Sequence, residues 1–450
     1  MISQDLLKKY SLSGPRYTSY PAVPHWTHTP ELGEWIDHVH DAFVKSNSQD
    51  GISLYIHLPF CESLCTYCGC NTRITVNHQV EKPYIESVLK EWDIYLRVFG
   101  DRPMIRELHL GGGTPTFFSP ENLHYLLTEI RSKSIIPEDA IFSFEGHPAN
   151  TTKEHLEVLF KNGFSRISLG IQDFDPKVQD IINRHQTPEQ IEQICLSSRA
   201  IGYTSVNFDL IYGLPLQTVN SIIKSIEKTI ALQPDRIAFY GYAHVPWIKP
   251  GQRKYTENDL PDPDTRLQMY YKGKEMLEEA GYFEIGMDHF ALKDDELLIA
   301  SRNQRLHRNF MGYTPYPTSL LIGLGVSSIS DSNTAFHQNV KTVEAYNTSL
   351  SRGILPTMKG HVLSERDLLL KEIILDLMCR FSATIPNNLI ATKELPLIYS
   401  EMIQDGLVSI DGNVISVEPK GRNLVRNICM MIDPYLTEQQ IDKPLFSRTI

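Results

Sequence analysis

Four of the seven cysteines in this 450-residue chain lie within ten residues, at Cys61, Cys65, Cys68 and Cys70. The first three have the spacing C-x3-C-x2-C and follow a short apolar run at 52–58 that indicates a strand. Thiolates this close together cannot all form disulfides without strain, and clustered thiolates usually bind zinc or iron–sulfur centres. Zinc sites usually add a second Cys or His pair, and none follows here. Three thiolates on one loop therefore favour a [4Fe–4S] cluster with one open iron, with a structural zinc or redox site as the alternative.

Composition limits the other possibilities. The chain is long enough for a barrel-sized core with an appended domain, and 41% of its residues are hydrophobic. The net charge of −11 argues against nucleic acid as a partner, so an anionic substrate would need a local basic pocket. No run of about 18 apolar residues and no apolar leader occurs, so we expect no membrane span and no signal peptide. The remaining cysteines are isolated in apolar surroundings, which fits a reduced, cytoplasmic compartment.

Apolar runs alternate with helical patterns after residue 50, whereas residues 1–50 read as an irregular arm with one short helical piece. The expected strands are 52–58, 105–110, 140–145, 166–171, 206–211 and 236–242. The expected helices are 80–98, 119–132, 152–162, 176–200, 220–232 and 264–280. This alternation predicts parallel strands with right-handed crossovers, in either an open doubly wound sheet or a barrel. No G-x-G-x-x-G follows the first strand, which weakens the dinucleotide-binding version.

The domain organisation predicted from these patterns has four parts. We expect an N-terminal arm at 1–50, a barrel core at 51–300, a barrel-covering segment at 301–360 and a C-terminal domain at 361–450. A strand near 407–415 and a helix near 419–432 would belong to the last part.

The carboxyl ends of the expected strands carry polar residues or glycine, and in parallel α/β folds reactive groups gather there. These positions are His57, Gly111 to Thr114, Glu145, Gln172 with Asp173, Asp209, and Tyr242 to His244. Each alone could be a turn or a cap, but together they indicate one pocket. Arg184 on the next helix could contact a ligand carboxylate or form a surface salt bridge. Arg16, in the turn-rich segment 14–21, could likewise face an anion or belong to a surface arm.

The cysteine spacing resembles the signature of the radical S-adenosylmethionine (SAM) superfamily. Over nearly its whole length the chain also resembles the oxygen-independent coproporphyrinogen III oxidases. The segments that carry this resemblance are 14–21, Cys68-Gly-Cys-Asn71, 111–115, 170–174, 209–215, 242–244, 286–290, Leu306-His-Arg-Asn-Phe310 and 426–429. The resemblance implies an α/β fold, a three-quarter TIM-like (β/α)6 barrel with a small, mainly helical C-terminal domain.

The resemblance also implies a [4Fe–4S] cluster held by Cys61, Cys65 and Cys68, and two SAM molecules. The residues that would contact the cluster-bound SAM are Tyr55, Tyr67, Gly112, Glu145 and Ile329. Those that would contact the second SAM are Gly113, Thr114, Gln172, Arg184, Asp209 and Ala243.

The activity implied is oxidative decarboxylation of two propionates of coproporphyrinogen III to vinyl groups, started by a 5′-deoxyadenosyl radical. The product would be protoporphyrinogen IX, in heme biosynthesis. The implied partners are this tetrapyrrole and an electron donor such as flavodoxin or ferredoxin, with the enzyme acting as a monomer.

The expected catalytic residues are Cys70, His57, Tyr55 and Glu145. Cys70 follows Cys68 too closely to be a good fourth iron ligand, so we expect it to serve the reaction or the substrate; a buried neutral thiol is the alternative. His57 could orient the cluster or be structural. His307 and Arg308 are candidates for propionate contacts. His147 is a departure, because many family members have an acid there.

Three rival functions are a heme-binding chaperone, a heme ring-opening radical SAM methyltransferase and a structural iron–sulfur protein. The chaperones usually carry an aromatic residue at the position of Cys70 and lack the His-Arg-Asn-Phe segment. Both features therefore favour the oxidase.

Overall fold

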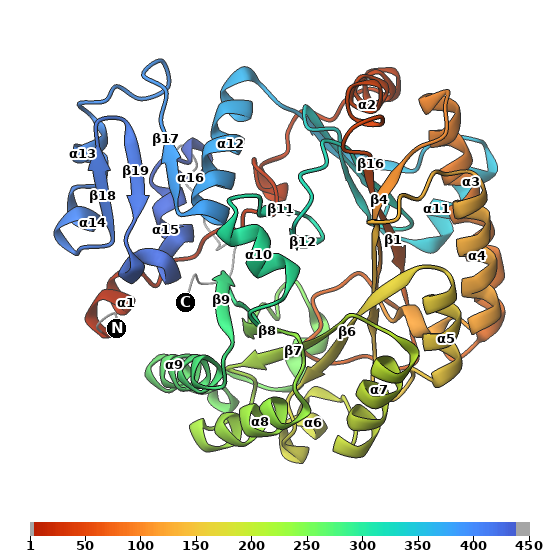
Figure 1. Cartoon of the computed structure of the whole chain (residues 1–450), viewed down its shortest axis with the longest axis horizontal. Helices are drawn as coiled ribbons and strands as arrows, with labels where there is room; N and C mark the ends of the chain where they lie inside the picture. Colours follow the sequence, from red (N-terminus) through yellow and green to blue (C-terminus); the bar gives the residue numbers. More distant parts are fainter. Residues whose placement is uncertain (1–3, 438–450) are drawn as a thin grey trace.

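The computed structural model describes residues 4–437 and is built around one curved sheet of twelve strands (Figure 1). Its centre consists of β1 (Ile52–Leu58), β4 (Ile105–Gly112), β5 (Ile141–Gly146), β6 (Phe164–Gln172), β7 (Ser205–Tyr212) and β8 (Arg236–Gly241). Neighbours among these six strands pair in parallel and follow one another in chain order. All six predicted strands are confirmed, each end within two residues. Strand order without reversal is the winding of a barrel, so the doubly wound alternative is wrong.

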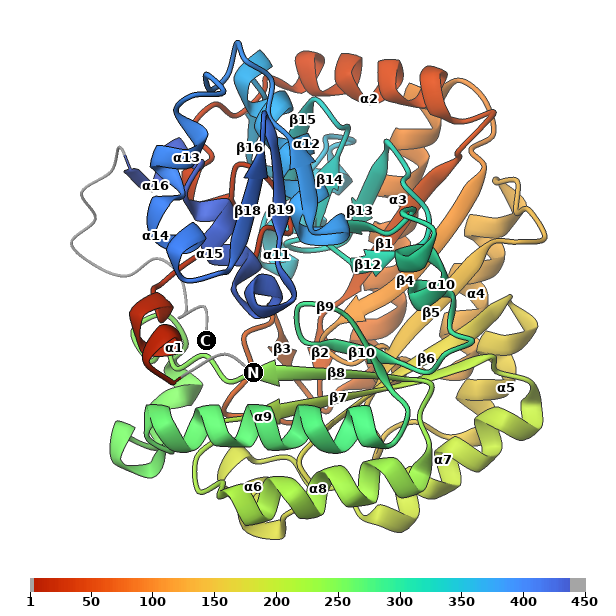
Figure 2. The same ribbon diagram turned by 60° about the vertical axis from the view of Figure 1, so that its left-hand side comes forward.

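Helices connect these strands and cover the outer face of the sheet (Figures 1 and 2). They are α3 (Glu81–Phe99), α4 (Pro120–Ser132), α5 (Lys153–Lys161), α6 (Pro176–Ile182), α7 (Pro188–Ile201), α8 (Val219–Leu232) and α9 (Pro263–Glu279). The single helix predicted at 176–200 is wrong, because the chain breaks between α6 and α7. Asn183 ends α6 in the left-handed region at φ 52°, and Thr187 starts α7 by capping the Gln190 amide.

Shorter strands extend both edges of the sheet. β13 (Leu321–Leu324) pairs in parallel with β1, and β14 (Ile329–Asp331), β15 (Ala335–Asn339) and β16 (Thr357–Val362) continue that edge antiparallel. At the other edge β10 (His289–Ala291) and β9 (Phe283–Gly286) pair antiparallel beyond β8. Helices α10 (Glu296–Arg302) and α11 (Val343–Ser351) belong to the same part of the chain. These short strands were not predicted.

The N-terminal arm contains more helix than predicted. Besides α1 (Gln4–Tyr10) it has α2 (Leu32–Ser46), whose fifteen residues contradict the expectation of one short helical piece. Trp35, Val39 and Phe43 lie on one face of α2 and are buried in the main core. A glutamate, Glu31, caps this helix through a capping box in place of the usual Ser or Thr, so the start signal was weak.

The C-terminal part combines helices with a small antiparallel sheet. It contains α12 (Glu365–Arg380), β17 (Ser382–Thr384), α13 (Leu395–Ile398), α14 (Ser400–Gln404), β18 (Val408–Asp411), β19 (Val414–Val417), α15 (Val425–Met430) and α16 (Pro434–Thr437). The strand predicted near 407–415 is a hairpin of β18 and β19. The helix predicted near 419–432 is a 3-10 turn at Pro419–Leu424 followed by α15.

A second hydrophobic core joins this C-terminal part to the arm, and α1 lies beside it in both ribbon views (Figures 1 and 2). Tyr17 and Tyr20 from the arm pack there with Leu377 of α12 and Ile428 of α15. The predicted boundaries at 300 and 360 stay a prediction. Within residues 4–437, every helix is too short or too polar to cross a lipid bilayer.

Candidate active site

Three neighbouring cavities meet inside the barrel. The cysteine cavity, of about 430 Å³, is lined by the loop that carries Cys61 to Cys70. The barrel cavity, of about 360 Å³, lies between the strands and the hairpin formed by β11 (His307–Asn309) and β12 (Gly312–Thr314). The tyrosine cavity, of about 260 Å³, is lined by Tyr55 and His57. Glu145, at the end of β5, lines all three.

The cysteine loop is closed at its base by two short parallel strands, β2 (Phe60–Cys61) and β3 (Arg73–Ile74). All four cysteines of the loop are free thiols. Cys61 Sγ lies 3.4 Å from Thr114 Oγ1, and the Cys70 backbone N–H donates to Cys68 Sγ at 3.4 Å. Arg184 Nη1 donates to Cys65 Sγ at 3.6 Å. The loop therefore presents its sulfurs among hydrogen-bond donors, an arrangement suited to thiolates.

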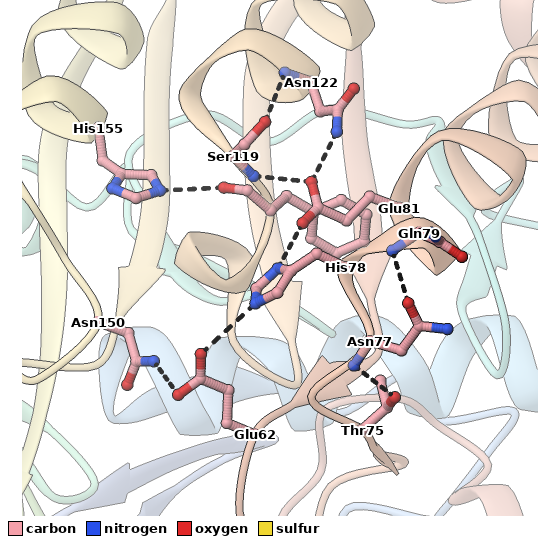
Figure 3. Close-up of polar contacts among 11 residues, drawn as sticks. Glu62, Thr75, Asn77, His78, Gln79, Glu81, Ser119, Asn122, Asn150 and His155 are labelled. Carbon is pink, nitrogen blue, oxygen red and sulfur yellow. Dashed lines mark hydrogen bonds and ion pairs between the residues drawn. The ribbon is translucent and has the colours of Figure 1, made fainter.

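A polar network fastens the outer side of this loop to the helices behind it, and Figure 3 shows Glu81 between the loop and the start of α4. Glu62 accepts a hydrogen bond from Asn150 at 2.8 Å and lies 3.7 Å from His78 Nε2. Glu81 is fully buried and contacts His78 Nδ1 at 2.7 Å. Glu81 also accepts from the Ser119 backbone N–H at 2.8 Å and from the Asn122 amide at 2.7 Å. Ser119 caps α4, so the loop and that helix share one carboxylate.

The thiols differ in their acidity. Burial raises the pKa of Cys61 to about 11. A hydrogen bond from Cys70 lowers the pKa of Cys68 to about 6, and the same bond raises the pKa of Cys70 well above its usual value. Cys70 therefore keeps its proton while Cys68 gives its proton up.

The donor set fits an iron–sulfur cluster. Within the described residues, no group of three or more His, Cys, Asp or Glu side chains could hold a single metal ion. In a four-iron cluster each thiolate binds a different iron, so the sulfurs need not converge on one point. Cys61, Cys65 and Cys68 are free, partly exposed and line one cavity, as such ligands must.

Most residues predicted to bind SAM line the cysteine cavity: Tyr67, Gly112, Gly113, Thr114, Glu145, Gln172, Arg184 and Asp209. Tyr55 and Ile329 line the tyrosine cavity instead. Ala243 lines none of the three cavities. The Gln252 side-chain amide donates to the carbonyl oxygens of Ala243 and Tyr67, at 3.1 Å each. Ala243 therefore lies behind the cysteine loop. The structure thus brings these residues to one region, and their roles stay a prediction.

Two glycines at the end of β4, Gly112 and Gly113, allow the chain to pass close to the first strand. A Cβ on Gly112, which has φ 116°, would lie 2.8 Å from the His57 ring, and one on Gly113 would lie 2.5 Å from the Pro59 carbonyl oxygen. The Gly112 N–H donates to Glu145 Oε2 at 3.2 Å. Because these residues have no side chains, their backbone atoms form part of the wall of the cysteine cavity.

Two carboxylates in the site have opposite pKa shifts. Burial disfavours ionisation of Glu145, but contacts with His109 and the Gly112 N–H outweigh it, so the Glu145 pKa is lowered. Burial raises the pKa of Asp209 to about 6, although Ser168 and Asn207 donate to it at 3.0 and 2.8 Å. Near pH 7, Glu145 is ionised and Asp209 lies close to its titration point.

The basic residues predicted in the site are largely buried. Arg184 is 9% exposed and donates to the Gly170 carbonyl, so it is not in a surface salt bridge. His57 lies 3.0 Å from Tyr55 Oη and 2.8 Å from the Asn71 carbonyl oxygen, and burial lowers its pKa. His147 lines the cysteine cavity and accepts the Ala149 N–H at 3.0 Å. Burial lowers the His147 pKa to about 3, so this neutral ring does not supply the charge of an acid.

Several residues of the cavities were not singled out from the sequence. They are His109, Ser168, Asn207, Arg236, Tyr240 and His289. All of them except His289 lie on predicted strands, and none is the last residue of its strand. Alternation along each strand could have placed them on the inner face.

Comparison with known proteins agrees with this geometry. A sequence profile described as the radical SAM superfamily matches residues 55–229. Oxygen-independent coproporphyrinogen III oxidase of Pseudomonas aeruginosa is 38% identical over 99% of this chain and 98% of its own length. The enzyme of that name from Escherichia coli is 37% identical over 99% and 98%. The solved structure of coproporphyrinogen III oxidase (HemN) from Escherichia coli, titled as a radical SAM enzyme, superposes with a TM-score of 0.90 at 34% identity. It covers 97% of this chain and 99% of its own.

The chain belongs to the oxygen-independent coproporphyrinogen III oxidase family. The match extends through the arm and the C-terminal part, so the resemblance inferred from the sequence is confirmed. The three-quarter barrel is confirmed as well.

Proposed function

We propose that this chain converts two propionates of coproporphyrinogen III to vinyl groups and so forms protoporphyrinogen IX in heme biosynthesis. The observation that carries the proposal is the meeting of two cavities at Glu145, in a chain matched over its full length by this family. One cavity has the thiolates of a radical-generating cluster, and the other is lined by arginines that suit a substrate with several carboxylates.

Cys61, Cys65 and Cys68 would hold a [4Fe–4S] cluster, with two SAM molecules beside it. When bound, the reduced cluster and SAM supply a 5′-deoxyadenosyl radical that removes a hydrogen atom from the β-carbon of a propionate. The buried Arg184 donates a hydrogen bond from Nη1 to Cys65 Sγ and would hold that ligand in position. Glu145, held by the Gly112 N–H and near His109, can accept hydrogen bonds from ribose hydroxyls or an ammonium group.

The remaining residues orient the reactants and exclude water. Tyr55 Oη contacts one nitrogen of the His57 ring, and the other ring nitrogen contacts the Asn71 carbonyl oxygen. These two contacts connect the tyrosine cavity to the cysteine loop. Cys70 is exposed on the loop and lines both the cysteine and tyrosine cavities, so its thiol can donate hydrogen toward a reactant there. A carbon radical attacks most nearby C–H bonds, so a deep cavity that holds one carbon close is required.

In each round the substrate radical loses CO2 and passes one electron to an external one-electron acceptor, and a vinyl group is left. The proposal includes an external donor such as flavodoxin or ferredoxin to reduce the cluster. It also includes a monomeric enzyme in the cytoplasm.

The test is anaerobic reconstitution with iron and sulfide, followed by reductant, SAM and coproporphyrinogen III. We expect 5′-deoxyadenosine together with a product lighter by two CO2 and four hydrogen atoms. Tight heme binding without a vinyl product would favour the chaperone function. A gain of methyl mass would favour the methyltransferase, and a cluster spectrum that SAM leaves unchanged would favour a structural iron–sulfur protein.

A further inference from the structure

The barrel cavity brings several arginines together in a chain whose net charge is −11. Four guanidinium groups line it, and they come from parts of the chain far apart in sequence: Arg16, Arg166, Arg236 and Arg308. Arg16 comes from the arm, the next two from the starts of β6 and β8, and Arg308 from β11. Three carboxylates, those of Glu107, Glu145 and Asp209, line the same cavity. The case for an anionic ligand therefore depends on whether each arginine has an acidic partner.

Three of these arginines already have an acidic partner. Arg16 pairs with Asp288, Arg166 pairs with Glu296, and Arg236 Nε lies 2.5 Å from Asp295. Their charges are therefore largely compensated within the protein.

Arg308 differs from them. Its side chain forms no salt bridge with the described residues, and its Nε and Nη1 atoms are buried without a hydrogen-bond partner there. Arg308 is only 7% exposed, and its guanidinium lies over the Tyr313 ring, 4.6 Å from the ring centroid. A buried cationic donor without an acceptor is costly, so an acceptor from outside the protein is expected.

No acid among the described residues forms an ion pair with Arg308, although Glu145 and Asp209 line the same cavity. The His289 side chain of β10, which lines the same cavity, is kept neutral because burial lowers its pKa to about 4. Tyr240 on β8 stays protonated because burial raises its pKa. The acid Asp288 forms an ion pair with Arg16, and Arg426 of α15 adds a further positive charge. Among the described residues, Arg308 is thus left without an acidic partner, and two of its nitrogen atoms have no acceptor.

We infer that Arg308 binds a carboxylate of the ligand that fills the barrel cavity, which on the proposed function is a propionate of the tetrapyrrole. The next residues of the hairpin, Phe310 and Met311, line both the barrel cavity and the tyrosine cavity. A macrocycle anchored by Arg308 would therefore lie against the hairpin tip and reach toward Glu145. His307, the other candidate from the sequence, lines neither cavity, because neighbouring residues of a strand point to opposite sides.

The test uses the full-length, anaerobically reconstituted protein and coproporphyrin III, the air-stable oxidised form of the substrate, with binding followed by tryptophan fluorescence quenching. We expect Arg308→Gln to weaken binding about tenfold or more, because a buried charge-assisted pair is lost. Arg308→Lys keeps the charge without the bidentate geometry and should lose less. His307→Gln is the matched control on the same strand, and its affinity should equal that of the wild type.

Arg308→Ala provides the second measurement, because it leaves space for a small cation. Added methylguanidinium should restore part of the affinity of Arg308→Ala and leave wild-type affinity unchanged, whereas a merely structural role for Arg308 would show no such rescue. If the wild type does not bind coproporphyrin III, the proposed function is wrong. If the wild type binds and the folded Arg308→Gln variant binds equally well, or methylguanidinium has no effect on Arg308→Ala, the inference about Arg308 is wrong and the proposed function survives.

Discussion

The cysteine cavity and the barrel cavity are built in different ways. The cysteine cavity takes its thiols from ten consecutive positions and its other groups from the ends of neighbouring strands. The barrel cavity takes its four arginines from the arm, two strand starts and a hairpin that begins at residue 307. The first is a local motif on a scaffold, and the second exists only once the whole chain has folded. Damage to the first should abolish chemistry, whereas damage to the second should weaken substrate binding.

The largest effect is expected from the three cluster ligands. Replacing Cys61, Cys65 or Cys68 by Ala removes one of three thiolates on which the cluster depends, so iron binding should be lost altogether. Iron analysis and visible absorption after reconstitution provide the measurement. Cys195→Ala, in a buried cysteine far from the cavity, is the control and should keep its iron. A variant of the three that kept a full four-iron cluster would contradict the assignment.

A variant at Cys70 distinguishes a role in the reaction from a role in binding the cluster, within the same loop. Cys70→Ser should keep the cluster and lower turnover about 100-fold or more, the usual contribution of a positioned proton or hydrogen donor. Product formation and iron content are measured on the same sample. Loss of iron would show instead that Cys70 is a ligand.

The contrast between the cavities also explains what the sequence could predict. The central strands were predictable because buried apolar residues recur along each of them, as at Ile167, Leu169 and Ile171 of β6, and the cysteine motif because its spacing is local. The strands β13 to β15 are three to five residues long, and they are stabilised by partners distant in sequence. Propensity is weak over such lengths.

The same limit applies to the arginines. Arg308 and His307 were equally good candidates in the sequence, because nothing local shows which face of a three-residue strand points inward. The hairpin is oriented by contacts such as that of Thr314 with the buried Glu107 of β4, more than 200 positions away. Arg184 could not be distinguished from a surface residue for the same reason.

A smaller effect is expected at Asp209, which lies between the two cavities. Asp209→Ala should weaken the second SAM about tenfold and the first SAM less, because one charge-assisted hydrogen bond is lost. Burial raises the Asp209 pKa to about 6, so the carboxylate forms as pH rises through that value. In the wild type, affinity for the second SAM should therefore fall as pH is lowered from 7 to 5, and this dependence should vanish in the variant.

Equilibrium dialysis at several pH values measures both SAM affinities. Asp180→Ala, in an acid that is 75% exposed, is the matched control and should change neither. If Asp209→Ala lowered the affinity for both SAM molecules equally, the assignment of Asp209 to the second SAM would be wrong.

The smallest effect is expected from the network behind the cysteine loop, and it shows whether that loop is held by its ligands or by the fold. Glu81→Ala would leave the Ser119 N–H and the Asn122 amide without an acceptor in a buried place. The free energy of unfolding of the iron-free protein should fall by about 2 kcal/mol, as for other buried donors left unpaired. His78→Ala removes a side chain that is 53% exposed and should cost less than about 1 kcal/mol. Urea unfolding measures both. Neither substitution changes a cysteine, so both variants should still bind the full amount of iron. If Glu81→Ala instead lost as much iron as the cysteine variants, the fold, and not the thiolates alone, would determine whether the cluster can form.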